Sequence, residues 1–255
     1  MHTYIHSFQS EWLKRRRSAA SWLTIGGALL VPAIILFVRF HESDGLAAAN
    51  ASPHLWESLY SRSWQFMAFF LLPMGVVLAT SLITQLEYRS NAWKQVCTTP
   101  QSLTTIFWAK LSVIVVMLLL FFGLFNIGIY LEGVIPCVHG GVAYPAEPFP
   151  FTAFLRGNGK FFLYCLPIVT LQYLISLFFK NFMAPLGAGL GLYVASMIAV
   201  HWKYGYAVPY TYAILAMMGK DGPGSPVHIG AWATGYAVVF LGLGYILYIT
   251  KKEKG

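Results

Sequence analysis

Charged residues are scarce in this chain, and their scarcity argues against a soluble fold. Asp, Glu, Lys and Arg together make up 10% of the 255 residues, whereas 57% are hydrophobic, and soluble domains carry about 25% charged residues. Because no segment is polar enough to form a soluble domain, the composition predicts a membrane protein. The formal net charge of +8 is typical of cytoplasmic loops that face anionic lipid, and no basic-aromatic patch indicates a nucleic-acid partner.

Catalytic and ligand-binding motifs are also missing. The cysteines Cys97, Cys137 and Cys165 fit no metal-binding spacing. The sequence holds no His-Glu-x-x-His pair, no Gly-x-Ser-x-Gly turn and no Gly-Lys-Ser/Thr loop. We therefore expect that this chain is not an enzyme and that it holds no metal or cofactor of its own.

What the chain does have is long apolar runs. A helix needs about 20 apolar residues to cross a bilayer, and six runs qualify, over residues 19–38, 64–86, 105–130, 161–179, 182–200 and 230–250. Only Lys180 and Asn181 separate the fourth run from the fifth, but a single helix there would reach about 60 Å, twice the hydrocarbon thickness. We therefore predict an all-α polytopic membrane protein with one six-span transmembrane domain over residues 19–255.

The distribution of basic residues predicts the orientation of the spans. Six spans place both termini on one side of the membrane. The segments on that side are 1–18, 87–104, 180–181 and 251–255, and they carry Lys and Arg at a higher density than the opposite segments 39–63, 131–160 and 201–229. By the positive-inside rule both termini are predicted to be cytoplasmic.

Acidic side chains are absent from the predicted spans. All nine Asp and Glu residues fall outside the six runs, and the most polar mid-span side chains are Asn126 and Gln172. Ion-coupled transporters and proton relays usually need an ionisable group in the membrane; because we find none, we expect the energy for any transport to come from elsewhere. Asn126 and Gln172 are more typical of hydrogen bonds between helices than of substrate contacts.

Residues 1–18 have the pattern of an amphipathic helix. Apolar and aromatic side chains from Tyr4 to Trp12 fall on one helical face, and the basic run 14–17 follows. This pattern suits an interfacial helix on the cytoplasmic surface before the first span; a basic anchor without a defined helix is the alternative. The candidate residues of the interfacial helix are Phe8, Glu11, Trp12 and Arg15.

A short polar segment between the second and third runs offers a surface to a soluble partner. Residues 91–96 can form a short helix, a break follows at Pro100, and Thr104 is placed to cap the third span. Trp93 is either an anchor for a protein pocket, since interface hot spots favour Trp and Arg, or an interfacial belt residue. The candidate coupling residues are Glu87, Tyr88, Arg89, Asn91, Trp93, Lys94, Thr99 and Pro100.

This arrangement resembles the membrane subunit of ABC type-2 transporters, especially the small six-span permeases of bacterial lantibiotic immunity and drug export. The family has a Glu at the end of span 2, a short coupling helix, a Pro-containing turn and a Lys at the start of span 3. The matching positions are Glu87, the 91–96 helix, Thr99-Pro100 and Lys110, and the Glu11-Trp12-Leu13-Lys14 stretch is similar to the family's interfacial helix. The chain departs from the family at Asn91-Ala92, where Gly-Thr is common, and at Leu103, where a basic residue is common.

The resemblance implies partners and a mechanism. A separate ABC ATPase, carrying ATP and Mg, would dock on the 91–100 helix, and this chain would supply the substrate path without catalysis. The family also implies a second permease subunit, identical or related, within the lipid bilayer of a bacterial plasma membrane. The implied substrate of such an exporter is an amphiphile, such as an antimicrobial peptide, a drug or a lipid.

The segment after the fifth run is aromatic and too short to span the membrane. The family places re-entrant gate helices here, and non-helical backbone at membrane depth must line a cavity or be buried in protein. The candidate outer-gate residues are Pro209, Tyr210, Tyr212 and Met217. The alternative is an interfacial aromatic belt that only anchors the last span.

Two other functions are weaker alternatives. A stand-alone channel or facilitator predicts a polar or charged stripe along a pore, and the predicted spans show none. An intramembrane enzyme would need a constellation such as His139, His201 and His228 with a carboxylate partner, and no carboxylate lies at a recognisable spacing from them. The sequence therefore favours an ABC permease subunit.

Overall fold

The computed structural model describes residues 2–16, 18–41, 45–89, 102–139, 141–179, 181–220 and 228–250. Over these ranges every regular element is a helix and no strand occurs. The prediction of an all-α polytopic membrane protein is confirmed, because several of the helices are long and apolar enough to cross a bilayer.

Five stretches of helix meet that requirement, and a sixth apolar helix falls short of it. The five are α2 (Ala19–His41), the continuous run of α4 (Leu55–Phe66), η2 (Met67–Leu71) and α5 (Leu72–Arg89), α7 (Leu103–His139), α8 (Phe151–Phe178) and α11 (Ile229–Thr250). The sixth, α9 (Met183–Ala199), has 17 residues. The short elements are α1 (His2–Arg15), α3 (Leu46–Ala51), η3 (Gly205–Ala207), η4 (Pro209–Thr211) and α10 (Tyr212–Met217).

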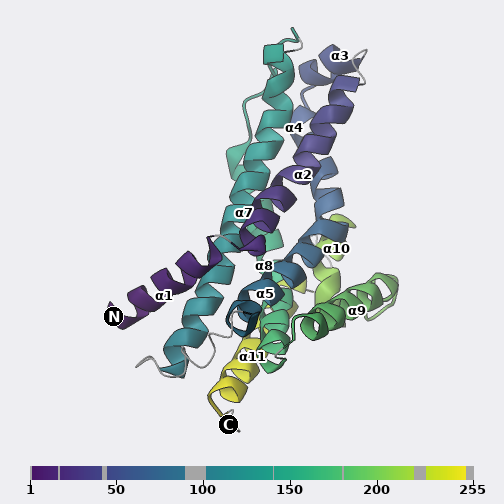
Figure 1. The fold of residues 1–255 in the computed structure, drawn as a ribbon. Coiled ribbons are helices and arrows are strands. Elements are labelled where there is room, and N and C mark those ends of the chain that lie inside the picture. Colours follow the sequence, from purple (N-terminus) through teal and green to yellow (C-terminus); the bar gives the residue numbers. More distant parts are fainter. Residues whose placement is uncertain are drawn as a thin grey trace.

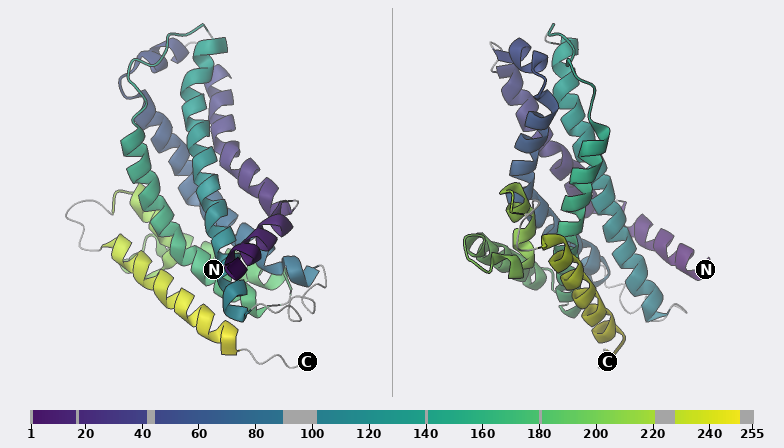
Figure 2. Two further views of the ribbon diagram at one scale, coloured as in Figure 1. Left: turned by 90° about the vertical axis from the view of Figure 1, so that its left-hand side faces the viewer. Right: turned by 180° about the vertical axis from the view of Figure 1, so that it is seen from behind.

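The helices form two halves along the length of the molecule. Helices α2, α4 and α7 run together toward the end where α3 lies, as Figures 1 and 2 show. In the other half α5, α9 and α11 pack around α8. Helix α1 and the C-terminal end of α11 lie toward this second half (Figure 1). Helix α7 belongs to both halves, because its 37 residues run past the ends of its neighbours.

The core is strongly aromatic and joins α4 to α7 and α8. Trp64 of α4 has no exposed surface, and its ring stacks on Phe161 of α8 with the centroids 3.8 Å apart. The edge of Phe125 of α7 meets the same Trp64 ring at 5.2 Å. Large aromatic side chains bury much apolar area each and prefer such stacked and edge-to-face contacts, so this cluster fixes the spacing of the three helices.

Helices α7 and α8 continue beyond the predicted spans, which end at residue 130 and begin at residue 161. The added turns hold buried residues, among them Pro136 of α7 and Phe154 of α8. Glu132 lies in the extension of α7 and has no exposed surface, and Lys110 near the start of α7 is 2% exposed. The expectation that the spanning helices hold no ionisable side chain is therefore wrong. The expectation ended the third span before Glu132 and did not consider Lys110 within it, although both charged side chains are held by partners from distant segments.

The second spanning stretch changes its geometry at η2, a π-helical turn between α4 and α5. Pro73 follows this turn, and it has no N–H to donate to the carbonyl four residues back, that of Phe69. The hydroxyl of Tyr193 in α9 donates to the Phe69 carbonyl instead, at 2.6 Å. A side chain from another helix thus satisfies the backbone group that the proline leaves free.

The two polar mid-span side chains join helices, as the sequence predicted. Asn126 of α7 and Asn158 of α8 exchange hydrogen bonds of 2.9 and 2.8 Å. Gln172 of α8 donates to the Ser81 hydroxyl at 2.9 Å and to the Pro185 carbonyl at 2.7 Å. Both contacts lie between helices, which confirms the interhelical role expected for Asn126 and Gln172.

Candidate functional site

The predicted coupling residues lie largely outside the part of the chain that the structure describes. Asn91, Trp93, Lys94, Thr99 and Pro100 fall between the described ranges that end at residue 89 and begin at residue 102. The other three, Glu87, Tyr88 and Arg89, end helix α5, where the backbone alone is described. The role of this segment stays a prediction.

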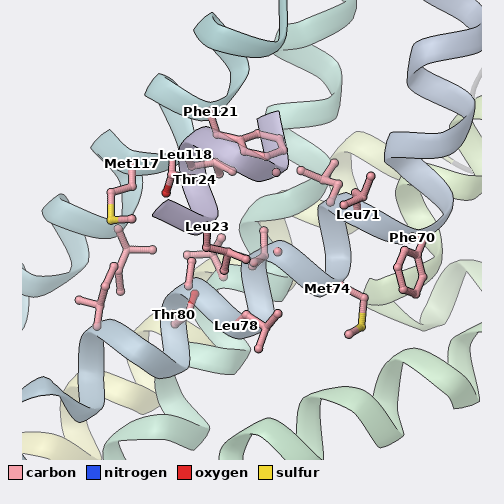
Figure 3. A pocket seen from close by; sticks show the side chains of 18 residues that line it. Leu23, Thr24, Phe70, Leu71, Met74, Leu78, Thr80, Met117, Leu118 and Phe121 are labelled. Atoms are coloured by element: carbon pink, nitrogen blue, oxygen red, sulfur yellow. The ribbon is translucent and has the colours of Figure 1, made fainter. Parts of the chain in front are cut away.

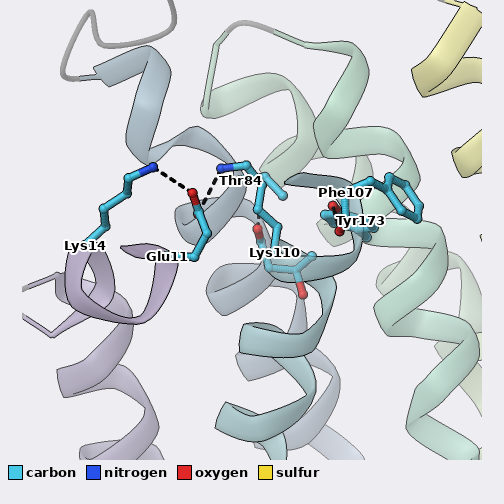
Figure 4. A network of polar contacts seen from close by, with 7 residues as sticks. Glu11, Lys14, Thr84, Phe107, Lys110 and Tyr173 are labelled. Atoms are coloured by element: carbon cyan, nitrogen blue, oxygen red, sulfur yellow. Dashed lines mark hydrogen bonds and ion pairs between the residues drawn. The ribbon is translucent and has the colours of Figure 1, made fainter. Parts of the chain in front are cut away.

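Helix α1, the predicted interfacial helix, is attached to α7 by a buried ion pair. Glu11 accepts from the Lys110 ammonium at 3.0 Å and from the Lys14 ammonium at 2.6 Å, and Figure 4 shows its carboxylate between the two. Glu11 is 7% exposed. Nearer the N-terminus, the hydroxyls of Tyr4 and Ser112 lie 2.7 Å apart. Helix α1 is therefore attached to α7 at two levels.

Burial makes the Glu11–Lys110 pair costly to break. Taking two charges out of water is unfavourable, and their attraction compensates only while both partners are present. Removing one partner leaves an uncompensated buried charge, a loss of about 3–5 kcal/mol in comparable pairs. Lys110 lies two turns into α7, the helix that follows the segment predicted to couple to a partner.

The other predicted residues of the interfacial helix lie on the side of α1 that faces the bundle. Phe8 and Trp12 are half-buried against the core, with their rings stacked 6.0 Å apart. The Arg15 guanidinium lies over the Trp12 ring at 3.7 Å from its centroid, and partial burial lowers the pKa of Arg15. Ile5, which the periodicity places on the same face, is 44% exposed. The predicted apolar face of α1 is therefore packed against the bundle at Phe8 and Trp12 and exposed at Ile5.

A second buried charged cluster lies at the far end of α7. The Arg39 guanidinium of α2 donates to the Glu132 backbone carbonyl and to the Asn50 side-chain oxygen. The Ser63 hydroxyl of α4 lies 3.3 and 3.4 Å from the two Glu132 carboxylate oxygens. Arg39 is 8% exposed, and the other three residues have no exposed surface.

Pro136 explains why the Glu132 carbonyl needs an outside donor. A proline within a helix cannot donate to the carbonyl four residues earlier, and for Pro136 that carbonyl belongs to Glu132. The Arg39 guanidinium fills the missing place. Sequence reasoning overlooked this cluster, although Arg39 and Glu132 each stand alone between apolar residues, Val38 and Phe40 for Arg39, which is a usable signal of a buried charge.

Of the four predicted outer-gate residues, the two tyrosines are buried within the protein, and Pro209 and Met217 are half-buried. Tyr210 and Tyr212 are 2% and 0% exposed, and the Tyr210 hydroxyl donates to the Gln172 side-chain oxygen at 3.4 Å. Pro209 begins the 3-10 turn η4, where the missing N–H is harmless. Met217 ends α10 and packs against the core. The segment thus meets the burial requirement for irregular backbone at membrane depth, while its role as a gate stays a prediction.

An apolar cavity of about 210 Å³ lies between α2, the η2–α5 junction and α7. Figure 3 shows Phe70, Phe121, Thr24 and Thr80 among the side chains around it. Among the described residues that line it, Thr24 and Thr80 alone carry side-chain hydroxyls. The cavity could accept an apolar group but offers few polar contacts to orient it.

Comparison with known proteins adds one finding to this geometry. The model of a family described as ABC-2 family transporter protein matches residues 7–196, which is more than half of the chain. The matched region runs from α1 into α9. It therefore includes both buried charged clusters and the predicted coupling segment from Glu87 to Pro100. No curated protein and no solved structure matches the chain.

Proposed function

The chain belongs to the ABC-2 transporter family, and on that premise we propose that it is the membrane subunit of an ATP-driven exporter of an amphiphile. A member of this family is a transport component and not itself a catalyst. ATP and Mg would be bound by a separate ABC ATPase. The amphiphile would be an antimicrobial peptide, a drug or a lipid, exported through a bacterial plasma membrane with both termini of the chain in the cytoplasm.

The observation that carries this proposal is the buried ion pair between Glu11 and Lys110. A transport subunit must pass movement from a soluble ATPase to helices within the bilayer. Helix α5 ends at Arg89 and α7 begins at Leu103, so a partner bound to the segment between them would act on both helices at once. The ion pair would extend that movement to α1, because moving Lys110 away from Glu11 would leave a buried ammonium group without its carboxylate.

Within this proposal each group of predicted residues has one role. The coupling residues from Glu87 to Pro100 would form the ATPase docking surface. Residues Pro209, Tyr210, Tyr212 and Met217 would close the substrate path on the outer side, and the burial of the two tyrosines supports this assignment. A second permease subunit, identical or related, would complete the path.

The first test is the affinity of the ATPase for the chain in lipid nanodiscs. We expect Trp93→Ala to weaken this affinity by on the order of 2 kcal/mol, because a Trp at an interface hot spot contributes about that much, and to uncouple transport while the chain stays folded. The matched control is Trp22→Ala in α2, where the Trp is 74% exposed; this variant should bind the ATPase normally. Unchanged ATPase binding and transport in Trp93→Ala would remove the segment from the mechanism.

A broader test is purification of the tagged chain from its native membrane in mild detergent. Recovery of a stoichiometric ABC ATPase is the expected result, and a second six-span protein would make the permease pair heteromeric. A chain that is recovered alone, with and without ATP analogues, would contradict the ATP-driven proposal. Passive conduction in proteoliposomes would then be the activity to measure.

A further inference from the structure

A groove with a volume of about 700 Å³ runs between α7 and α8 on the outside of the bundle. Its walls are largely aromatic and include Phe122, Phe154 and Phe162. Residues on both rims are strongly exposed, among them Ile127 at 55% and Leu155 at 62%. Volumes of about 300–1,000 Å³ are typical of sites for small ligands. Because the rims are apolar and exposed, in a membrane the groove opens sideways to lipid.

The polar part of the groove is the amide pair of Asn126 and Asn158. Both side-chain N–H₂ groups are fully engaged. Asn126 donates to Asn158 at 2.9 Å and to the Phe122 carbonyl at 2.7 Å, and Asn158 donates to Asn126 at 2.8 Å and to the Phe154 carbonyl at 2.6 Å. Each amide oxygen can accept two hydrogen bonds and receives one from the other Asn. The groove therefore presents hydrogen-bond acceptors, so its ligand must bring a donor.

Two glycines give the groove its depth. Gly123 of α7 and Gly159 of α8 both line it, and a Cβ atom built on either one would meet no heavy atom within 4 Å. Neither glycine is therefore required for close packing of the two helices. At these positions the absence of a side chain creates free space.

The groove lies in the outer leaflet in the proposed orientation. The contacts of Glu11 with Lys110 and of Tyr4 with Ser112 place α1 beside residues 110–112 of α7. Asn126 lies 16 residues after Lys110, which is roughly 24 Å along the helix at a rise of about 1.5 Å per residue, and the hydrocarbon core of a bilayer is about 30 Å thick. If α1 lies in the cytoplasmic interface, as in the proposed orientation, the amide pair lies in the outer leaflet and the groove extends inward from it as far as Leu119.

We propose that the α7–α8 groove binds the acyl chain of a hydroxyl-bearing bilayer lipid, whose hydroxyl donates to the side-chain oxygens of Asn126 and Asn158. The chain lies along the aromatic walls and over Gly123 and Gly159. The apolar rims favour a ligand that enters from the lipid phase. The hydrogen-bond acceptors of Asn126 and Asn158 favour a lipid with a free hydroxyl. This binding requires no ATP and no partner subunit, so it can be tested separately from transport.

The test uses photolabelling of the whole chain in nanodiscs. The probe is a monoacylglycerol with a diazirine in its acyl chain, and the matched probe is the same molecule with both hydroxyls methylated. Labelled peptides are mapped by mass spectrometry. We expect the label on segments 119–130 and 151–162, with about fivefold less from the methylated probe, the change expected for the loss of one hydrogen bond.

Variants that fill the groove supply the control. Gly123→Leu and Gly159→Leu should each reduce labelling of the two segments at least fivefold. Gly242→Leu in α11 adds the same side chain where a Cβ also meets no atom within 4 Å, and it should leave the labelling unchanged. Thermal unfolding of all three variants verifies that they fold.

Three outcomes would overturn the proposal. The first is equal labelling by both probes, because the amide oxygens would then play no part. The second is labelling that persists in the two groove variants. The third is a cross-link between two copies of the chain through this groove, because a partner subunit would then occupy the place assigned to the lipid.

Discussion

The two ends of α7 are both held by buried charge, but through different chemistry. Near its start, Lys110 pairs with the Glu11 carboxylate, which has a second partner in Lys14. At the far end, Arg39 binds the backbone carbonyl of Glu132, which Pro136 has left without its usual donor. The Glu11 carboxylate lies between two ammonium groups, so it can keep one ionic partner when the other moves away. The Glu132 carbonyl has no donor within its own helix that could take the place of Arg39. The first end is suited to movement and the second to fixed attachment.

The largest expected effect comes from removing the fixed attachment. Arg39→Ala leaves the Glu132 carbonyl and the Asn50 side chain without their buried donor, and we expect the free energy of unfolding to fall by about 3–5 kcal/mol. Equilibrium denaturation in mixed micelles measures this loss. The matched control is Arg62→Ala in α4, an exposed arginine, which should change stability by less than about 0.5 kcal/mol.

A double-mutant cycle with Pro136 tests the reason for this effect. Pro136→Ala restores an N–H that can donate to the Glu132 carbonyl. Arg39→Ala should therefore cost at least about 1 kcal/mol less in the Pro136→Ala background than in the original chain, the worth of one hydrogen bond. If the two changes add without coupling, the guanidinium does not act by replacing the donor that proline lacks.

Neutralising the pair at the other end should cost less. Glu11→Gln removes the negative charge but keeps an oxygen that can accept from the Lys110 ammonium, so we expect a loss of about 2 kcal/mol, less than the roughly 3–5 kcal/mol for removing a buried partner altogether. Denaturation of this variant, with the exposed Glu57→Gln as control, gives the value. In the charge swap Glu11→Lys with Lys110→Glu, at least half of the loss should return. A loss equal to that of Arg39→Ala would contradict the proposed contrast between the two ends.

Tyr193→Phe separates the effect of charge from that of capping a free carbonyl. This change removes the donor to the Phe69 carbonyl, a neutral counterpart of the Arg39 contact. We expect a loss of about 1 kcal/mol, because a neutral hydrogen bond contributes about that much, and the same denaturation assay measures it. Tyr204→Phe, at a tyrosine that is 46% exposed, should have no effect. If Tyr193→Phe lowered the free energy of unfolding by more than about 3 kcal/mol, a neutral donor to a free carbonyl would be enough to explain the effect of Arg39→Ala, and the charge of Arg39 would not be needed.

The smallest expected effect tests the second partner of Glu11. The Lys14 side chain is 35% exposed, and partly exposed ion pairs contribute about 0–1 kcal/mol. Lys14→Ala alone should therefore change the unfolding free energy by less than about 1 kcal/mol. In the Lys110→Met background the same change should cost more, because Lys14 is then the only described basic partner of the carboxylate. Equal costs in both backgrounds would show that the partners do not exchange.

The sequence predicts the helices better than it predicts the contacts between them. The apolar runs indicate the all-α membrane fold, and the isolated Asn126 and Gln172 indicate hydrogen bonds between helices. The hydropathy pattern places Glu132 in a loop, because such a pattern treats every charged residue as exposed. A single sequence does not show which distant residue holds a buried charge, and 99 residues separate Glu11 from Lys110. The pairing depends on how the helices pack, which periodicity does not determine.

The π-helical turn at Met67–Leu71 separates the rotational phase of α4 from that of α5. A π turn holds about one residue more than an α-helical turn, and one residue corresponds to about 100° of rotation in an α-helix. Deleting a single residue there would turn Trp64 out of the aromatic core while α5 kept its place against α8. Helices α4 and α5 are continuous, but the extra residue rotates one relative to the other. Each helix can therefore turn a different face toward its neighbours.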